Sequence, residues 1–155
     1  MQVHLLAIGT RMPDWVDQGT GEYVKRLAGD IRLQVHELAM PKRHANTRAL
    51  IDAEAELLKK RLDTLPGALS VAMEVGGRQL DTPALAKRLG TLRDEGRDLA
   101  LLVGGPDGLQ PALSAQCDER WSLSALTLPH PLVRVILAEQ VYRCWSLLNG
   151  HPYHR

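Results

Sequence analysis

Five short runs of hydrophobic residues recur along the chain, and each is long enough for a buried β-strand. They cover residues 3–8, 33–38, 69–75, 99–103 and 122–128, and several are apolar almost without interruption. Uninterrupted apolar strands are typical of parallel sheets, because helices cover both faces of such a sheet. The pattern therefore predicts a mostly parallel sheet.

Segments with hydrophobic residues at helical spacing lie between these runs. The predicted helices cover residues 14–27, 47–62, 83–95, 110–117 and 131–148. Asn46 or Thr47 is the expected cap of the second helix, and Thr82 is the expected N-cap of the third, with Pro83 at its first position. Strands that alternate with helices predict an α/β fold, here a single domain over residues 1–155 with helices flanking the sheet.

The last predicted helix is apolar around most of its circumference, which is typical of a buried helix. In a chain of 155 residues one side of it would cover the sheet, and the other side needs a second partner. A homodimer interface supplies that partner most simply. The alternative is that the helix packs between layers of its own chain.

Composition and charge narrow the class of protein without naming it. Hydrophobic residues make up 45% and charged residues 24%, as in ordinary globular proteins. No apolar run reaches the roughly 18–20 residues that cross a bilayer, and the first ten residues do not resemble a signal peptide. Cys117 and Cys144 form no CxxC pair, so we expect buried free thiols and a cytoplasmic protein. A net charge of +1 neither indicates nor excludes nucleic-acid binding.

The ends of three predicted strands carry the candidate binding chemistry, since ligands of open parallel sheets bind at carboxyl ends. The run GGPDGL, residues 104–109, follows one strand, and its glycines allow close approach of backbone to a ligand or simply form a tight turn. Pro129 and Pro131 flank His130 after another strand and fix an extended, kinked loop whose backbone suits recognition of an adenine edge. His130 is either catalytic or a packing residue. Met73, near the third strand end, could stack on a flat ring or belong to the core.

The tail NGHPYHR gathers several polar side chains within a few positions. His151 and His154 alone do not make a metal site, because no carboxylate or thiolate accompanies them at ligand spacing. An RNA-facing role fits this set better, since Arg pairs with phosphate, Tyr or His stacks on bases, and His moves protons. No GxSxG elbow or nucleophile motif supports a hydrolase.

Four segments together resemble one family: MPDWV, GRDLALLVGGPDGL, WSLSALTLPHPLVRVILAEQVYRCW and the terminal HPYHR. The chain closely resembles, over essentially its whole length, the small SPOUT-class methyltransferases that modify N3 of pseudouridine in large-subunit ribosomal RNA. The resemblance implies a C-terminal trefoil knot, which periodicity cannot reveal. It also implies S-adenosylmethionine as methyl donor, a homodimer, and large-subunit ribosomal RNA within the assembled ribosome as substrate. We expect no metal.

The resemblance also implies site residues in this chain. The tail of one chain would close over the cofactor of the other, with Tyr153, His154 and Arg155 in catalytic roles. The positions expected to contact the cofactor are Met73, Gly104, Gly105, Leu123, Ser124, Ala125, Leu126, Thr127 and Leu128. Three alternatives stay open: a nonenzymatic ribosome-binding module, a SPOUT enzyme acting on another RNA such as transfer RNA, and a small-molecule enzyme that uses the glycine loop for phosphate.

Overall fold

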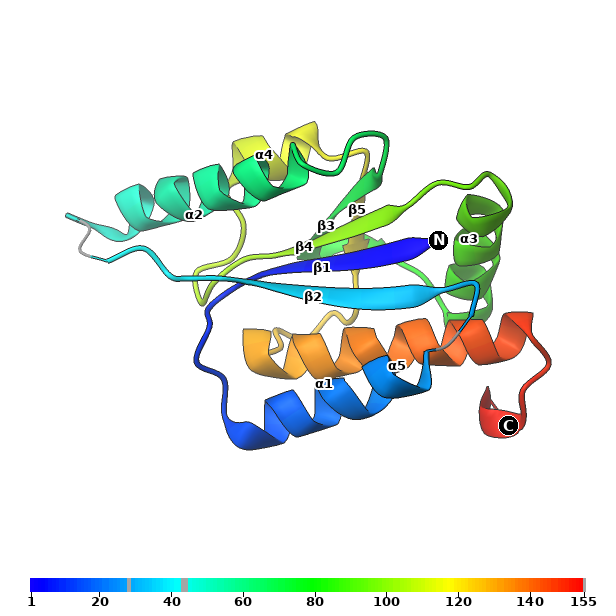
Figure 1. The fold of residues 1–155 in the computed structure, drawn as a ribbon. Coiled ribbons are helices and arrows are strands. Elements are labelled where there is room, and N and C mark those ends of the chain that lie inside the picture. Colours follow the sequence, from blue (N-terminus) through cyan, green and yellow to red (C-terminus); the bar gives the residue numbers. More distant parts are fainter. Residues whose placement is uncertain (28, 43–44, 155) are drawn as a thin grey trace.

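The computed structural model describes residues 1–27, 29–42 and 45–154, with His154 described in its backbone only. Figure 1 shows a central sheet between two layers of helices. The elements in chain order are β1 (Gln2–Ile8), α1 (Asp14–Arg26), β2 (Arg32–Leu38), α2 (Thr47–Leu62), β3 (Leu69–Gln79), α3 (Thr82–Asp94), β4 (Leu99–Val103), α4 (Pro111–Gln116), β5 (Glu119–Ser122), α5 (His130–Leu148) and a 3₁₀ turn, η1 (Pro152–His154).

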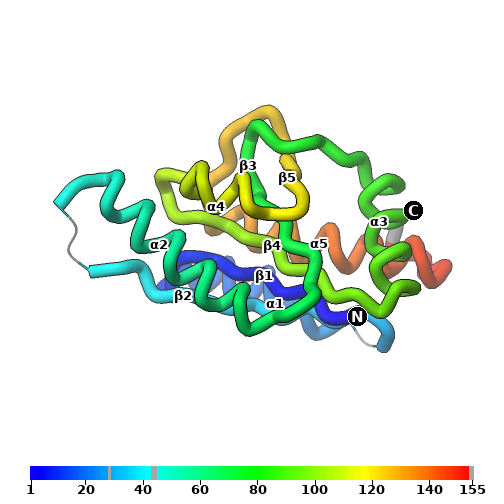
Figure 2. Tube along the Cα trace, turned by 90° about the horizontal axis from the view of Figure 1, so that it is seen from above, coloured from blue at the N-terminus to red at the C-terminus, as the bar shows by residue number. Residues whose placement is uncertain are grey.

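The five strands form one sheet in the order β2-β1-β4-β3-β5, and every pair is parallel. The prediction of an α/β fold with a parallel sheet is therefore confirmed. Helices α1, α3 and α5 cover one face, where they enclose the larger apolar cluster, and α2 and α4 cover the other (Figures 1 and 2). The central strand β4 is buried at all of its residues, which accounts for its continuous run of aliphatic side chains.

Strand β3 is longer than predicted because it bends round the edge strand β5. Both Met73 and Arg78 lie in register with Trp121, so the intervening residues bulge out of the ladder. Gly77 crosses the Trp121 backbone so closely that a Cβ at this glycine would lie 2.5 Å from the Trp121 carbonyl carbon. The glycine permits the close crossing, and the strand continues to Gln79.

Two predictions about local structure were wrong. The strand expected at 122–128 is β5, which ends at Ser122, and the hydrophobic run after it is a loop. The N-cap of α3 is Asp81 rather than Thr82, because the Asp81 carboxylate accepts from the Ala84 N–H at 2.8 Å. The Asn46 cap of α2 is confirmed, with its side chain accepting from the Ala49 N–H at 2.9 Å.

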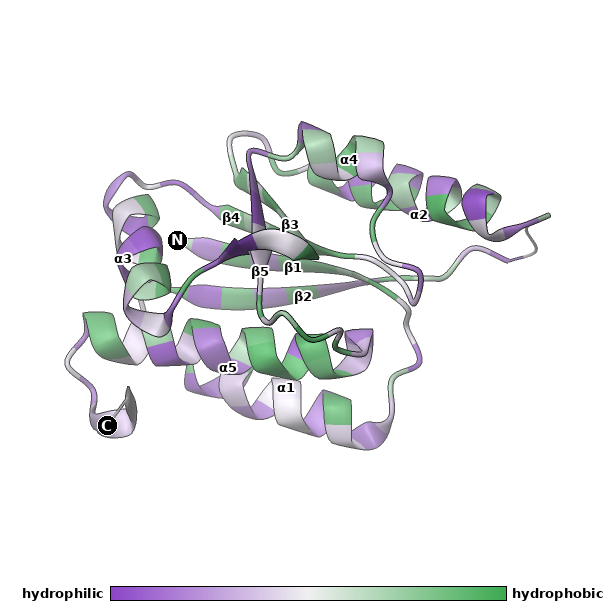
Figure 3. Cartoon of the chain, turned by 180° about the vertical axis from the view of Figure 1, so that it is seen from behind, coloured by the Kyte–Doolittle hydropathy of each residue, from purple (hydrophilic) through white to green (hydrophobic). Residues whose placement is uncertain are grey.

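Helix α5 lies along one face of the sheet and contacts both α1 and α3 (Figure 1). Its residues Leu137, Ala138, Val141 and Cys144 belong to the core. Figure 3 shows hydrophobic residues over much of its length. Several of them are only half-buried in the single chain: Leu132, Val133, Val135, Ile136, Leu147 and Leu148.

Both cysteines are free thiols, but they differ in exposure. Cys144 is fully buried, and burial raises the pKa of its thiol to about 12. Cys117 is only half-buried, so the expectation of two buried thiols holds for Cys144 alone. Within the described part of the chain, no helix has the length and apolar character needed to cross a membrane.

Candidate cofactor cleft

A cleft of about 700 Å³ opens beside the bulge of β3, where β4 ends and where the chain leaves β5. Its walls come from the bulge of β3 that begins at Met73, from the glycine loop 104–109, and from the loop that leads into α5. Pockets for small molecules and cofactors typically measure about 300–1,000 Å³ and lie at the carboxyl ends of parallel strands. Both the size and the position of this cleft fit that description.

The glycine loop forms one wall, and its sequence follows from how tightly it is packed. A Cβ at Gly104 would lie 2.5 Å from backbone atoms of Gly108, and a Cβ at Gly105 would lie 2.5 Å from a carboxylate oxygen of Glu54. The Gly105 N–H donates to the buried Glu54 carboxylate at 3.3 Å. Gln110 donates to Asp52, also on α2, at 2.6 Å. Helix α2 therefore fixes the loop from below.

The loop after β5 forms the second wall and satisfies its backbone without a strand partner. The Ser122 hydroxyl donates to the Ser124 carbonyl at 2.9 Å, and the Leu126 N–H donates to the Ser124 hydroxyl at 2.9 Å. Such local side-chain bonds compete with sheet pairing. Leu126 is 73% exposed, so the apolar run that suggested a strand faces outward at the mouth of the cleft.

The corner Pro129-His130-Pro131 starts α5 beside the cleft. Pro129 is the N-cap, and its carbonyl accepts from the N–H groups of Leu132 and Val133 at 3.0 and 3.2 Å. Burial and the nearby Arg134 lower the pKa of His130. Its Nδ1 is buried and has no hydrogen-bond partner among the described residues.

Arg134, one turn further along α5, ties this corner to the sheet. Its side chain is buried, and one terminal nitrogen donates to the carbonyls of Ile8 and Gly9 at 2.8 and 2.7 Å. The other terminal nitrogen pairs with Glu37 at 2.7 Å. Burial lowers the pKa of Arg134, and Glu37 opposes that effect. The start of α5 is thereby anchored to the ends of β1 and β2.

The lining fits an adenosyl group with an attached sulfonium chain. Most of the wall is apolar, and the polar groups are chiefly backbone, which suits hydrogen bonding to a base edge beside an apolar ring face. Met73 lies where a ring could stack on it. Glu74 also lines the cleft, and its carboxylate accepts from the Ser114 hydroxyl at 2.8 Å.

Of the nine positions expected to contact the cofactor, eight line this cleft: Met73, Gly104, Gly105, Leu123, Ser124, Leu126, Thr127 and Leu128. Ala125 belongs to the same loop but does not line the cleft. Sequence reasoning missed Glu74, Val75, Leu109 and Val133 as lining residues. Their only signal was adjacency to the strand ends and to the prolines.

The tail packs at the opposite end of α5, far from the cleft of its own chain (Figures 1 and 2). Helix α5 has 19 residues, which corresponds to about 28 Å at 1.5 Å per residue. The Tyr153 ring lies 4.6 Å from the Tyr142 ring, centroid to centroid, with Arg143 over its face at 5.1 Å. The His151 carbonyl accepts from Ser146 at 2.7 Å. These contacts give the tail a defined seat.

Of the three predicted catalytic residues, the structure describes the side chain of Tyr153. The Tyr153 hydroxyl donates to Glu139 at 3.2 Å and lies 3.4 Å from the Tyr23 hydroxyl. Burial, together with Tyr23 and Glu139, raises the pKa of Tyr153, so its phenol stays protonated here. The His154 side chain and Arg155 lie outside the described residues.

Comparisons with known proteins give a family and relatives for the whole chain. A family model described as "Predicted SPOUT methyltransferase" matches residues 1–154. A protein of Alcanivorax borkumensis named "Ribosomal RNA large subunit methyltransferase H" is 62% identical over 160 residues, and the match covers all of both chains. A protein of the same name from Hahella chejuensis is 50% identical over 157 residues and covers all of this chain and 99% of that one.

Solved structures share the fold at low sequence identity. A probable methylase family protein from Haemophilus influenzae covers 99% of this chain and 70% of its own, with a TM-score of 0.59 and 13% identity. A probable methyltransferase from Bordetella pertussis covers 92% of this chain and 95% of its own, with a TM-score of 0.55 and 15% identity. At these identities the likeness concerns the fold alone.

Proposed function

The chain belongs to the SPOUT methyltransferase family, whose members take their methyl group from S-adenosylmethionine, and from this premise we propose that it methylates large-subunit ribosomal RNA. The position proposed is N3 of a pseudouridine in 23S ribosomal RNA, and the site of action is the cytoplasm. The observation that carries the proposal is the full-length match, at 62% identity, to a protein named for this class of substrate. The trefoil knot remains a prediction.

The cleft supports the binding half of this function. Gly104, Gly105 and the loop 123–128 would hold the adenosyl group through backbone atoms, and Met73 would pack on a ring. When bound, S-adenosylmethionine supplies a methyl group already activated by its sulfonium. The task left to the chain is therefore to align the acceptor nitrogen with that methyl group and to exclude water, a proximity effect of up to about 7–11 kcal/mol in favourable cases.

The imide N3–H of the target must also lose its proton. We assign the proton-accepting role to His154, because the raised pKa of Tyr153 keeps its hydroxyl a donor in its present seat. Tyr153 would then orient the base or hydrogen-bond to it, and Arg155 would stabilise the imide anion or clamp a phosphate. General base catalysis of this kind contributes about 10²–10⁴-fold.

A homodimer completes this site. The tail lies a full helix length from its own cleft, so it can act only on the cleft of another chain. A two-fold axis across the middle of α5 would place the tail of one chain beside the cleft of its partner, as closed symmetric dimers allow. The half-buried apolar residues of α5 and the 53% exposed Trp15 of α1 are the surface that such a dimer would cover.

Truncation after Pro152 tests the catalytic assignment. We expect calorimetry to show unchanged S-adenosylmethionine binding and a methylation assay on ribosomes to show no turnover. The Tyr153→Phe variant keeps the ring on Tyr142 and separates loss of packing from loss of the hydroxyl. Turnover by the truncated chain would refute the role of the tail.

A modification map of ribosomal RNA from strains with and without the protein tests the function itself. A missing N3-methylpseudouridine in 23S ribosomal RNA is the expected result, and a lost modification in transfer RNA would redirect the proposal to another RNA. A chain that binds no S-adenosylmethionine in calorimetry would be a nonenzymatic ribosome-binding module instead. With a net charge of +1, the protein has little excess positive charge for nonspecific RNA affinity, so ribosomes should be better substrates than bare RNA.

A further inference from the structure

A second hollow, separate from the cofactor cleft, lies on the outer side of the edge strand β5. It has a volume of about 790 Å³ and is bounded by β3, α3, β5 and the end of α4. Four cationic residues line it: Arg78, Lys87, Arg88 and Arg120. The whole chain carries a net charge of only +1, so this gathering of cations concentrates positive charge at one place. We call this hollow the basic groove.

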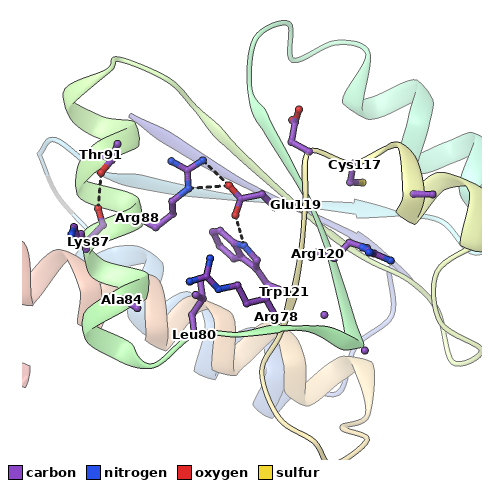
Figure 4. Close-up of a pocket in the computed structure, with 14 residues that line it drawn as sticks. Arg78, Leu80, Ala84, Lys87, Arg88, Thr91, Cys117, Glu119, Arg120 and Trp121 are labelled. Carbon is purple, nitrogen blue, oxygen red and sulfur yellow. Dashed lines mark hydrogen bonds and ion pairs between the residues drawn. The ribbon is translucent and has the colours of Figure 1, made fainter.

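The carboxylates of the basic groove are already engaged. Glu119 accepts from two nitrogens of Arg88 at 3.0 and 2.6 Å with one oxygen, and from the Trp121 indole N–H at 2.7 Å with the other (Figure 4). Asp118 accepts from the backbone and hydroxyl of Ser70, both at 2.8 Å. These acids fix the floor of the groove and leave little negative charge to compensate the remaining cations.

Two of the four cations have no ion-pair partner among the described residues. Among the described residues, no carboxylate pairs with the exposed side chains of Arg78 and Lys87. The Arg120 side chain is 61% exposed, and its ion pair with Glu74 is long, at 3.9 Å. Figure 4 shows the side chains of Arg78 and Arg88 close to the Trp121 indole, and all three residues line the groove. An anionic ligand could therefore bind these cations without first breaking strong ion pairs within the protein.

The basic groove borders the cofactor cleft along β3 and β5. Met73, Glu74 and Val75 line the cleft, and the next three residues of β3 line the groove. Two neighbouring residues of β5 are divided likewise: Ser122 lines the cleft, and Trp121 lines the groove. A polymer with one unit in the cleft would therefore have its neighbouring units in or near the groove.

We propose that the basic groove binds the phosphate backbone of the substrate RNA next to the target nucleotide, with Arg78 and Lys87 as the main phosphate contacts. The inference rests on the proposed function, since it takes the RNA to be the polymer that enters the cleft. Guanidinium forks match phosphate oxygens in pairs, and phosphate contacts set the register of a nucleic acid without reading its sequence. The groove thus positions the RNA, while the cleft selects the reacting base.

The test is the double charge reversal Arg78→Glu with Lys87→Glu, compared with Arg32→Glu with Lys60→Glu. The control pair also exchanges one exposed Arg and one exposed Lys, but on β2 and α2. Binding to ribosomes from a strain that lacks the protein is measured by co-sedimentation over a series of KCl concentrations. Methylation kinetics on the same ribosomes and calorimetry with S-adenosylmethionine complete the set.

For the groove pair we expect ribosome affinity to fall at least about tenfold near 0.1 M KCl, and KM to rise with little change in kcat. The slope of log affinity against log salt should become shallower by about 1.5, because each lost phosphate contact removes about 0.7–0.9. Binding of S-adenosylmethionine and the melting temperature should stay at the wild-type values. The control pair should match the wild type in every readout.

Unchanged ribosome affinity and salt dependence in the groove pair would overturn the inference, and so would an equal loss in the control pair. Neither outcome touches the proposed function, which fails only if the wild-type chain methylates no ribosomal RNA. Conversely, ribosome binding is measured without turnover, so the groove can be tested even if the reaction proves to be another.

Discussion

Replacement of Gly104 by alanine is the sharpest test of the cofactor cleft. The added Cβ would lie 2.5 Å from the carbonyl carbon and oxygen of Gly108 and 2.9 Å from the Leu109 nitrogen. Carbon atoms in contact prefer about 3.5–4.0 Å, so the two arms of the loop must separate by roughly 1 Å. The obstructing atoms are backbone, which cannot swing aside as a side chain can.

The cost of such overpacking is about 1–3 kcal/mol. In the free protein we expect the exposed side of the loop to open and to relieve most of this strain. Bound cofactor needs the closed loop, so the strain is expected to appear as a loss of S-adenosylmethionine affinity of about 5- to 150-fold. Calorimetric titration measures that loss, and thermal melting without ligand shows how much of the strain stays in the free fold.

Gly76→Ala is the matched control, because a Cβ at Gly76 meets nothing within 4 Å. We expect this variant to bind S-adenosylmethionine like the wild type. If Gly104→Ala alters neither affinity nor melting temperature, the glycine loop does not hold the cofactor in the way described, and the cleft loses its main support.

Three further predictions concern stability. Arg134→Met should lower the free energy of unfolding by about 1–3 kcal/mol, because it leaves the carbonyls of Ile8 and Gly9 without their buried donor. Chemical denaturation measures the loss, and the exposed Arg120→Met is a near-neutral control. Burial, aided by Arg61 and His4, lowers the pKa of His36 to about 4. Folding therefore favours the neutral ring, and the stability that this contributes should be fully present above about pH 6.5. The free energy of unfolding should fall by about 1–3 kcal/mol as the pH drops toward 4. The His36→Gln variant should lose less over the same range. Asp81→Ala should lower the free energy of unfolding by about 1 kcal/mol, because α3 loses its cap. Chemical denaturation measures this loss, and an unchanged free energy of unfolding would contradict it.

The parallel sheet and most helix limits could be predicted from the chain because they follow from local patterns. The run 99–103 is apolar throughout because both faces of β4 are covered, and the structure has that strand with the predicted limits. The Asn46 cap likewise depends only on neighbours a few positions away. Local signals of this kind survive folding because no distant contact competes with them.

The errors arose where a distant or polar contact decides the outcome. The residues after Ser122 are as hydrophobic as a strand, but Ser124 satisfies the local backbone and Leu126 faces outward, a use of apolar residues that hydrophobicity alone cannot separate from burial. Asp81 and Thr82 are both good caps, and the geometry at the helix start selects Asp81, while the Thr82 hydroxyl turns to Gln140 at 3.2 Å. The seat of the tail on Tyr142 joins residues by aromatic packing that no spacing rule predicts.

The cleft is built mainly from backbone, and this changes where its sensitivity to mutation lies. Two buried polar side chains from outside its wall hold that backbone in place: Glu54 accepts from Gly105, and Arg134 donates to Ile8 and Gly9. Loss of a buried hydrogen-bond partner leaves a polar group unsatisfied, so each bond fixes its loop more firmly than an exposed ion pair would. Lining residues such as Leu126, in contrast, offer mostly main-chain atoms to a ligand and leave their side chains in solvent. Substitution of Glu54 should therefore weaken cofactor binding more than substitution of Leu126, although Leu126 lines the cleft and Glu54 does not.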